Sequence, residues 1–248
     1  MRNHDELTLD KLSDAERQEV FEAFGPDPDM QLYDRGLRRR LPSMLGGDQR
    51  RMRMVYSLAF SLPGSPVLFY GEEIGMAENL DIPGRLAVRS PMQWTDGVNG
   101  GFSTAAKRKL TRPLPDGLFG PDRVNAAAQR HDHGSFWWFI RDLIYTYRQQ
   151  PEIGWSTPAI VKQPNRSVLA HVCRTDSAWE MLALHNFGDE GCLVPIELED
   201  APAGSVLVDL LDGLTEYPLD SAGRAELSLD AYGYRWLRVL RPGDDPII

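Results

Sequence analysis

At Pro151 the sequence changes character, and this change decides which folds are open to the chain. Just before it, residues 135–150 carry apolar side chains at helical spacing, and Ser135 is placed to cap the helix start. After it, short runs of strand-forming residues alternate with turn signals. We therefore expect an α/β region over residues 1–152 and an all-β region over residues 153–248.

The first region has a few clear elements between long irregular stretches. Ser13 and Glu16 have the spacing of a capping box, which predicts a helix start, and Asp48 can cap a second helix. Val67–Tyr70 is a short apolar run between turn signals, which predicts a fully buried parallel strand. Residues 71–134 lack periodicity and are rich in turn residues, which is typical of functional loops in a compact domain.

The second region contains regularly spaced short strands. Turn signals such as Asp212-Gly213 and Ala222-Gly223 separate them, and this pattern favours an antiparallel β-sandwich. The predicted strands are Ser167–Cys173, Glu180–Phe187, Ser205–Leu210, Ala225–Leu229 and Tyr234–Leu240.

The charge balance argues against two classes of partner. The chain has 27 Lys and Arg against 36 Asp and Glu, a net charge of −9, so nucleic acid and anionic lipid would repel it unless basic residues cluster. One such cluster consists of Arg35, Arg38, Arg39, Arg40, Arg50, Arg51 and Arg53. No aromatic stacking residues interleave with it, which favours a solvated helix face or carboxylate partners within the chain. We expect no nucleic-acid and no membrane partner.

Cysteine usage and hydropathy indicate the compartment. Cys173 and Cys192 are too few for a disulfide framework or a zinc site, and both lie in strand-like sequence, as small buried thiols do. No apolar run approaches the length of a membrane helix, and the first residues lack the apolar stretch of a signal peptide. We expect a cytoplasmic chain with no metal and no other cofactor.

Two groups of side chains suit carbohydrate chemistry. Asn3, His4 and Asp5 offer an amide, an imidazole and a carboxylate side by side, which can hold sugar hydroxyls and stabilise a developing oxocarbenium ion. Arg89 offers a planar fork of donors for vicinal hydroxyls or a carboxylate, and Trp94 offers a plate for a pyranose or simple core packing.

Glu72 and Glu73 follow the predicted buried strand, at the end that faces the active site in α/β barrels. They are candidates for acid/base groups. The interpretation we favour is that they order the loop or pair with arginines, and we assign them no catalytic role.

Taken in order, these motifs resemble the α-amylase superfamily of glycoside hydrolases and glucosyltransferases. Asn3–Asp5 resembles the motif at the end of barrel strand seven, and Gly64–Met76 resembles strand eight with its exit. Arg89–Trp94 and Asn99–Ser103 resemble the segment that follows strand eight. Arg38–Leu41 brings the pattern closest to the trehalose synthase branch, the maltose α-D-glucosyltransferases. The resemblance implies the last part of a (β/α)₈ barrel, strands seven to eight with the final helices, followed by the β-sandwich.

The resemblance also implies roles for individual residues. Asp5 matches the carboxylate that stabilises the transition state without attacking, and His4 matches the residue that hydrogen-bonds the sugar beside the bond being cleaved. Arg89 matches an arginine that clamps the terminal glucose, and Asn3 belongs to the same hydroxyl-binding group. Glu6 adjoins the motif and is expected on the aglycone side. The implied substrate is an α-glucoside such as maltose or trehalose.

One departure from the family limits this prediction. Retaining chemistry needs a nucleophile and a separate acid/base carboxylate, which in the family precede the motif matched by Asp5, and no segment of these 248 residues resembles them. We therefore expect a C-terminal portion of such an enzyme, inactive alone. The alternatives are an α-glucosidase or α-amylase-type hydrolase fragment, a non-catalytic carbohydrate-binding or assembly module, and one half of a split enzyme completed by a separate chain that supplies the other barrel strands.

Overall fold

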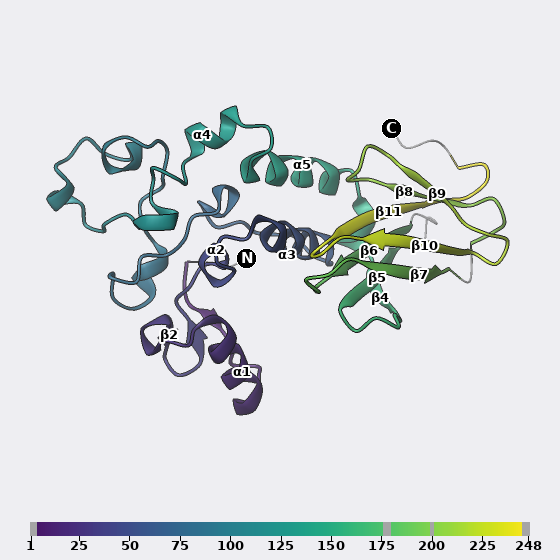
Figure 1. Ribbon diagram of the computed structural model, residues 1–248, viewed down its shortest axis with the longest axis horizontal. Coiled ribbons are helices and arrows are strands. Elements are labelled where there is room, and N and C mark those ends of the chain that lie inside the picture. Colours follow the sequence, from purple (N-terminus) through teal and green to yellow (C-terminus); the bar gives the residue numbers. More distant parts are fainter. Residues whose placement is uncertain (1–3, 176–179, 199–200, 245–248) are drawn as a thin grey trace. The chain divides into compact units, whose positions relative to one another are not determined.

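The computed structural model describes residues 4–175, 180–198 and 201–244 (Figure 1). The chain forms two compact units. The first unit comprises Met1–Met52 and Val67–Arg141, and the second comprises Arg53–Pro66 and Asp142–Ile248. The division therefore passes through two helices, whereas the boundary predicted at residue 152 follows the sequence pattern, and that boundary stays a prediction.

The α-helices are short. Their bounds are α1 Asp14–Phe24, α2 Leu41–Met44, α3 Gln49–Ser61, α4 Ala126–His131, α5 Phe136–Arg148 and α6 Pro151–Trp155. Helices α1, α3, α4 and α5 begin at a residue whose side chain accepts from their first amides. The Ser13 hydroxyl accepts from the amide of Glu16, whose carboxylate accepts in return from the Ser13 amide. Asp48 accepts from the amides at the start of α3, and Ser135 accepts from the Trp138 amide in α5. All three predicted helix starts are confirmed.

The predicted strand Val67–Tyr70 is wrong. The structure has no strand there, and Val67 and Tyr70 are 70% and 40% exposed. A strand needs a neighbour for its amides and carbonyls, and no described strand pairs with these residues. The Tyr70 carbonyl instead accepts from the Arg40 guanidinium at 3.1 Å. The prediction used only the apolar character of these four residues. Their burial in a sheet would also require neighbouring strands.

Arginine side chains hold the irregular part of the first unit together. Arg40 is 1% exposed and donates to the carbonyls of Tyr70 and Val88. Arg38 is likewise buried and donates to the Ile82 carbonyl at 2.7 Å. These bonds, and the ion pair from Arg39 Nε to Glu78 at 3.0 Å, turn three of the clustered arginines inward. The predicted carboxylate partner within the chain is confirmed for Arg39, whereas the side chains of Arg38 and Arg40 bind backbone carbonyls.

Short 3-10 helices and a small sheet complete the first unit. The 3-10 helices are η1 Pro28–Met30, η2 Glu72–Ile74, η3 Gly84–Val88, η4 Val98–Gly101, η5 Lys107–Lys109 and η6 Gly117–Phe119. The sheet consists of β1 Leu7–Thr8, β2 Gln31–Leu32 and β3 Gly36–Leu37 in the antiparallel order β1-β3-β2.

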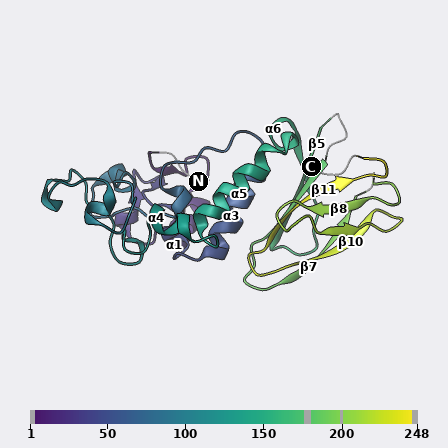
Figure 2. The same ribbon diagram turned by 90° about the horizontal axis from the view of Figure 1, so that it is seen from above.

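The second unit contains two antiparallel sheets (Figure 2). The strands are β4 Thr157–Val161, β5 Val168–Arg174, β6 Glu180–Asn186, β7 Cys192–Glu197, β8 Val206–Asp209, β9 Glu216–Pro218, β10 Arg224–Leu229 and β11 Tyr234–Leu240. Six of them pair in the order β4-β5-β6-β11-β8-β9, and β7 pairs with β10. All five predicted strands are present, within a few residues of their predicted bounds.

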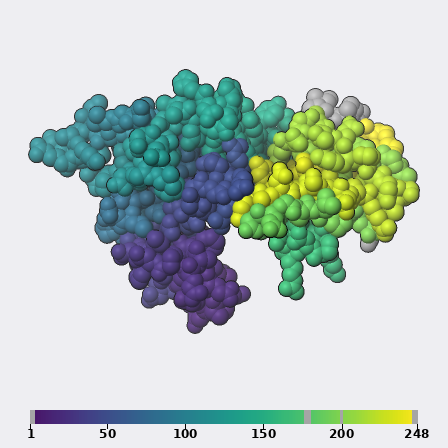
Figure 3. All heavy atoms as spheres, in the orientation of Figure 1, coloured from purple at the N-terminus to yellow at the C-terminus, as the bar shows by residue number. Residues whose placement is uncertain are grey.

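The three strands of the second unit that were not predicted each contain a proline. Pro158, Pro195 and Pro218 lie in β4, β7 and β9, and a proline in a sequence argues against a central strand. The sheets accept these prolines because β4 and β9 are the edge strands of the six-stranded sheet and β7 belongs to a two-stranded sheet. β4 and the loop after it project from the sheet, and Ile160 in β4 is 68% exposed (Figure 3).

One apolar core joins the two sheets of the second unit. Leu182, Leu207 and Leu237 of the six-stranded sheet are each 0% exposed, and they share a cluster with Val194 of β7 and Leu227 of β10. Cys173 in β5 is buried and Cys192 in β7 is partly buried, both with free thiols. Inward side chains from both sheets therefore form the interior of this unit.

Candidate functional site

The site is built on the short β1 strand, which directly follows His4, Asp5 and Glu6. β1 pairs with β3 through Leu7 opposite Leu37 and Thr8 opposite Gly36. Gly36 is required for this approach, because a Cβ there would lie 2.9 Å from the Leu7 carbonyl oxygen. The hairpin between β2 and β3 thus supports the segment that carries Asp5.

Two arginines converge on one oxygen of Asp5. Arg89 Nη2 lies 2.9 Å and Arg85 Nη1 lies 2.8 Å from Asp5 Oδ1. His4 Nε2 is 3.2 Å from the other oxygen, Oδ2, and Arg89 Nε donates to the His4 carbonyl at 2.7 Å. Residues some 80 positions apart in sequence therefore meet around one carboxylate.

These contacts fix the charge of Asp5. Its partial burial acts to raise the pKa of the carboxyl, but the hydrogen bond from Arg85 and the positive charges of His4, Arg85 and Arg89 outweigh that effect. The pKa of Asp5 is lowered below its ordinary value. The carboxylate is therefore ionised at neutral pH and cannot act as a proton donor there.

The other predicted site residues have different surroundings. Glu6 is mostly buried, and its Oε1 lies 3.5 Å from Arg35 Nη2. Asn3 lies outside the described residues. The structure thus brings His4, Asp5 and Arg89 together and pairs Glu6 with an arginine of the β2–β3 hairpin. The ligand roles of all four residues stay predictions.

Sequence reasoning missed Arg85. It lies on η3, and Arg89 follows directly after that 3-10 helix, so one short element presents both arginines to Asp5. The only signal in the sequence was a second arginine four positions before Arg89. Without a recognisable helix in that stretch, nothing indicated that both would point to one carboxylate.

Glu72 and Glu73 have separate roles in the structure. Glu72 is 2% exposed and accepts from the Phe69 amide at 2.9 Å, so it orders the loop as we interpreted. Gly71 before it has φ 83°, and a Cβ there would lie 2.5 Å from Met76 Sδ. This sharp turn directs Glu73 to the wall of a cavity.

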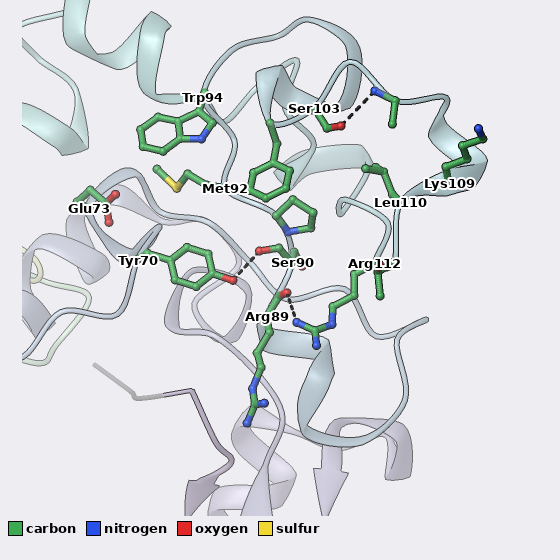
Figure 4. A pocket seen from close by; sticks show the side chains of 14 residues that line it. Tyr70, Glu73, Arg89, Ser90, Met92, Trp94, Ser103, Lys109, Leu110 and Arg112 are labelled. Carbon is green, nitrogen blue, oxygen red and sulfur yellow. Dashed lines mark hydrogen bonds between the residues drawn. The ribbon is translucent and has the colours of Figure 1, made fainter.

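A cavity of the first unit that is lined in part by aromatic side chains has a volume of about 690 Å³ (Figure 4). Tyr70, Met92, Trp94 and Phe102 line it, together with Glu73. His4 and Asp5 are not among its lining residues, and the Arg89 guanidinium points away from the other lining side chains in the view of Figure 4. The cavity and the Asp5 cluster therefore meet only through Arg89.

The described residues contain no group of three His, Cys, Asp or Glu side chains that could hold a metal ion. The same part of the chain contains no helix long and apolar enough to cross a membrane.

Two known protein families match parts of this chain. The catalytic-domain model of the α-amylases matches residues 36–156, and the model of the sucrose hydrolase-like C-terminal domain matches residues 179–238. The chain therefore contains an α-amylase-family domain and a sucrose hydrolase-like C-terminal domain. The match to the α-amylase catalytic domain includes η3, Arg85 and Arg89.

Characterised relatives cover nearly the whole chain. A trehalose synthase of Pimelobacter is 35% identical over 98% of the chain, and the trehalose synthase/amylase TreS of Mycobacterium tuberculosis is 35% identical over 96%. The chain spans 42% and 40% of the length of these two relatives. Their similarity therefore concerns somewhat less than half of each enzyme.

Solved structures share the fold. An α-amylase from H. orenii superposes with a TM-score of 0.62 at 21% identity, covering 81% of this chain and 37% of the amylase. The trehalulose synthase MutB gives a TM-score of 0.62 at 20% identity, covering 81% of this chain and 41% of MutB. At this level of identity the likeness concerns the fold alone.

Proposed function

We propose that His4, Asp5 and Arg89 form the transition-state-stabilising part of an α-glucosyl active site of the trehalose synthase type, which interconverts maltose and trehalose. The observation that carries the proposal is that His4 and Arg89 both contact Asp5. Arg89 Nη2 lies 2.9 Å from Asp5 Oδ1, and His4 Nε2 lies 3.2 Å from Asp5 Oδ2. Arg89 Nε also donates to the His4 carbonyl at 2.7 Å. The 35% identity to trehalose synthases over almost the whole chain supports it.

The proposed role of Asp5 follows from its charge. In α-glucosyl transfer with retention, the sugar ring gains positive charge as the glycosidic bond breaks. An ionised carboxylate beside the ring stabilises that charge and accepts hydrogen bonds from ring hydroxyls. Arg85 and Arg89 keep Asp5 ionised and fix its orientation, so it acts by electrostatics and does not transfer a proton.

We further propose that a polypeptide of these 248 residues does not turn over substrate by itself. Double displacement requires a nucleophile and an acid/base carboxylate as well as the stabilising one, and only the match for the last is found here. A separate chain that supplied the other barrel strands would complete the site. Such complementation is the split-enzyme form of the same proposal.

Two other functions have specific support. The relatives include an α-glucosidase of Apis mellifera, 27% identical over 180 residues, which favours a hydrolase as the first alternative. They also include the human amino acid transporter heavy chain SLC3A1, 43% identical over 79 residues. That second relative favours a non-catalytic assembly module, because its name describes a transporter subunit.

The finer fold is part of the proposal. We infer that residues 1–152 correspond to strands seven to eight and the final helices of a (β/α)₈ barrel, and that residues 153–248 correspond to the C-terminal β-sandwich. The two family matches and the core shared by both sheets support this division. We also propose a cytoplasmic location, which rests on cysteine usage in the sequence.

The direct test is to incubate the purified chain with maltose and to measure glucose and trehalose. The proposal predicts no turnover above the uncatalysed rate. Turnover at an ordinary enzyme rate would contradict it, because the chain would then contain a nucleophile and an acid/base group that we have not found. Binding of maltose without turnover would favour the non-catalytic alternative unless a complementing chain restores activity.

A further inference from the structure

We propose that the cavity of about 690 Å³ in the first unit binds a nucleoside monophosphate whose base carries an exocyclic amine. The volume lies within the range of small-molecule sites. The lining combines cations, aromatic rings and a carboxylate, which match the phosphate, the base and the amine of such a ligand. The inference goes beyond the proposed α-glucosyl chemistry and does not depend on it, because Asp5 is not a lining residue.

A basic segment borders this cavity. Residues 107–112 include the four cations Lys107, Arg108, Lys109 and Arg112, in a chain whose net charge is −9. Lys109 and Arg112 line the cavity. Among the residues that the structure describes, none of the four has a carboxylate partner. Cations that cluster without carboxylates beside them create a positive local potential, which favours an anionic ligand.

Arg112 is held at the cavity wall with part of its guanidinium free. Its Nη1 donates to the Arg89 carbonyl at 3.3 Å, which leaves Nε and Nη2 for a ligand (Figure 4). Burial raises the pKa of the Tyr70 hydroxyl, and nearby arginines, Arg112 among them, act against this rise. The positive potential therefore reaches the aromatic wall. An arginine fork and a lysine ammonium are both suited to a phosphate.

Exposed rings supply a surface for the base. Trp94 and Phe102 are 52% and 54% exposed, and both line the cavity. A planar base stacks on such a ring and covers apolar surface that otherwise contacts water. Tyr70 is a third lining ring, and its hydroxyl donates to the Ser90 carbonyl at 2.7 Å, which fixes its place in the wall. A phosphate alone would leave these rings uncovered.

Glu73 indicates which base fits. Its carboxylate lines the cavity and has no hydrogen-bond or ion-pair partner within the described part of the chain. In the view of Figure 4, Glu73 and Trp94 lie at one side of the cavity and Lys109 lies at the other. A carboxylate repels phosphate and accepts from N–H groups. We therefore place the phosphate at Lys109 and Arg112, and the amine of the base at Glu73.

The first test compares ligands on the wild-type chain of 248 residues by ligand-observed NMR at neutral pH. Adenosine 5′-monophosphate is expected to bind saturably with a Kd below about 1 mM. Adenosine and inorganic phosphate each lack half of the ligand and should bind at least about tenfold more weakly. Inosine 5′-monophosphate should also bind about tenfold more weakly, because a carbonyl replaces the amine and would face the Glu73 carboxylate.

Substitutions test each part of the cavity. Trp94→Ala should weaken binding of adenosine 5′-monophosphate by about tenfold through the lost stacking surface. Lys109→Gln should weaken it by about fivefold. Arg108→Gln is the matched control, because Arg108 is an exposed cation of η5 outside the lining, and the change expected is less than about twofold. Glu73→Gln should remove the preference for the adenine base, because an amide accepts from an amine and donates to a carbonyl.

Absence of saturable binding of adenosine 5′-monophosphate to the wild type would overturn the proposal. Inorganic phosphate that binds as tightly would also overturn it, since the cavity would then be an anion site only. Equal affinity of the wild type for the adenine and hypoxanthine nucleotides would refute the assignment of Glu73. Equal weakening by Lys109→Gln and Arg108→Gln would show unspecific charge attraction. Circular dichroism checks that each variant is folded, and the ligand series on the wild type needs no variant.

Discussion

The two units satisfy their backbone polar groups in different ways. In the second unit, strand ladders pair most amides and carbonyls above a large apolar core. In the first unit, residues 67–125 contain no α-helix or strand, and buried arginines such as Arg38 and Arg40 bind carbonyls instead. One apolar cluster there contains Ile74 and Met76. Strand pairing over a shared core therefore distinguishes the second unit, and bonds from buried arginines to carbonyls distinguish the first.

The largest expected effect concerns the core of the second unit. Leu237 is 0% exposed on β11 and belongs to the core shared by both sheets. Leu237→Ala should lower the free energy of unfolding of this unit by about 4 kcal/mol, through lost burial and the cavity left behind. Hydrogen exchange of the β6 and β11 amides would report it. Unchanged protection there would show that the core is not the main support.

Acid should destabilise the same unit by a similar amount. Burial and the nearby His171 lower the pKa of His185 to about 3, against the opposing effect of a hydrogen bond with Ser57, and burial also lowers the pKa of His171. An unfolded histidine takes up a proton below about pH 6.5, whereas folded His185 stays neutral until about pH 3, so stability falls as pH drops from 6.5 toward 3. The lowered pKa of His171 acts in the same direction.

By pH 4.5 the expected loss is about 3 kcal/mol, measured as denaturant unfolding at several pH values. His185→Leu should flatten this pH dependence. The control is His131→Gln at an exposed position, which should leave it unchanged. Equal slopes in all three proteins would contradict the assignment to buried histidines.

The matching prediction for the first unit concerns Arg40. Arg40→Gln would remove the guanidinium donors of the Tyr70 and Val88 carbonyls, which should cost about 2 kcal/mol. Exchange of the amides around residues 70–90 should rise, while that of the β-strands stays constant. Arg108→Gln at an exposed position is the control. If Arg40→Gln loosened both units equally, the contrast between them would fail.

The smallest expected effect is at the start of α1. Ser13→Ala removes the hydroxyl that accepts from the Glu16 amide and should cost about 1 kcal/mol of local stability. Exchange of the α1 amides would measure it. A threonine hydroxyl can keep the cap, so Ser13→Thr should behave as the wild type. Equal exchange of the α1 amides in Ser13→Ala and Ser13→Thr would show that the cap does not stabilise the helix.

Elements with local signals were predictable from the sequence. Helix starts at Ser13, Asp48 and Ser135 depend on neighbours three residues away, and alternating strands carry their own pattern. The run at Val67–Tyr70 was not predictable, because strand formation there depends on partners outside its own sequence. The strands with Pro158 and Pro195 were missed because only the sheet order shows them to be edge positions.

The candidate site was predictable in part for the same reason. His4, Asp5 and Arg89 were found through the resemblance of their motifs, and the structure brings them into contact. Arg85 was missed because its role depends on the path of an irregular loop.

The sequence pattern near residue 152 does not show which earlier residues pack with the β region. Buried His171 and His185 contact Ser61 and Ser57 of α3. The β region thus includes a helix end from far earlier in the chain.

The central claim is that Asp5 stabilises an α-glucosyl transition state when the other carboxylates are supplied. The most direct measurement is trehalose formation from maltose by this chain combined with a polypeptide carrying the preceding barrel part of a trehalose synthase relative. We predict activity with the wild type and a loss of at least about 100-fold in Asp5→Asn, because the charge beside the ring is removed. Equal activity of the two complemented proteins would contradict the claim.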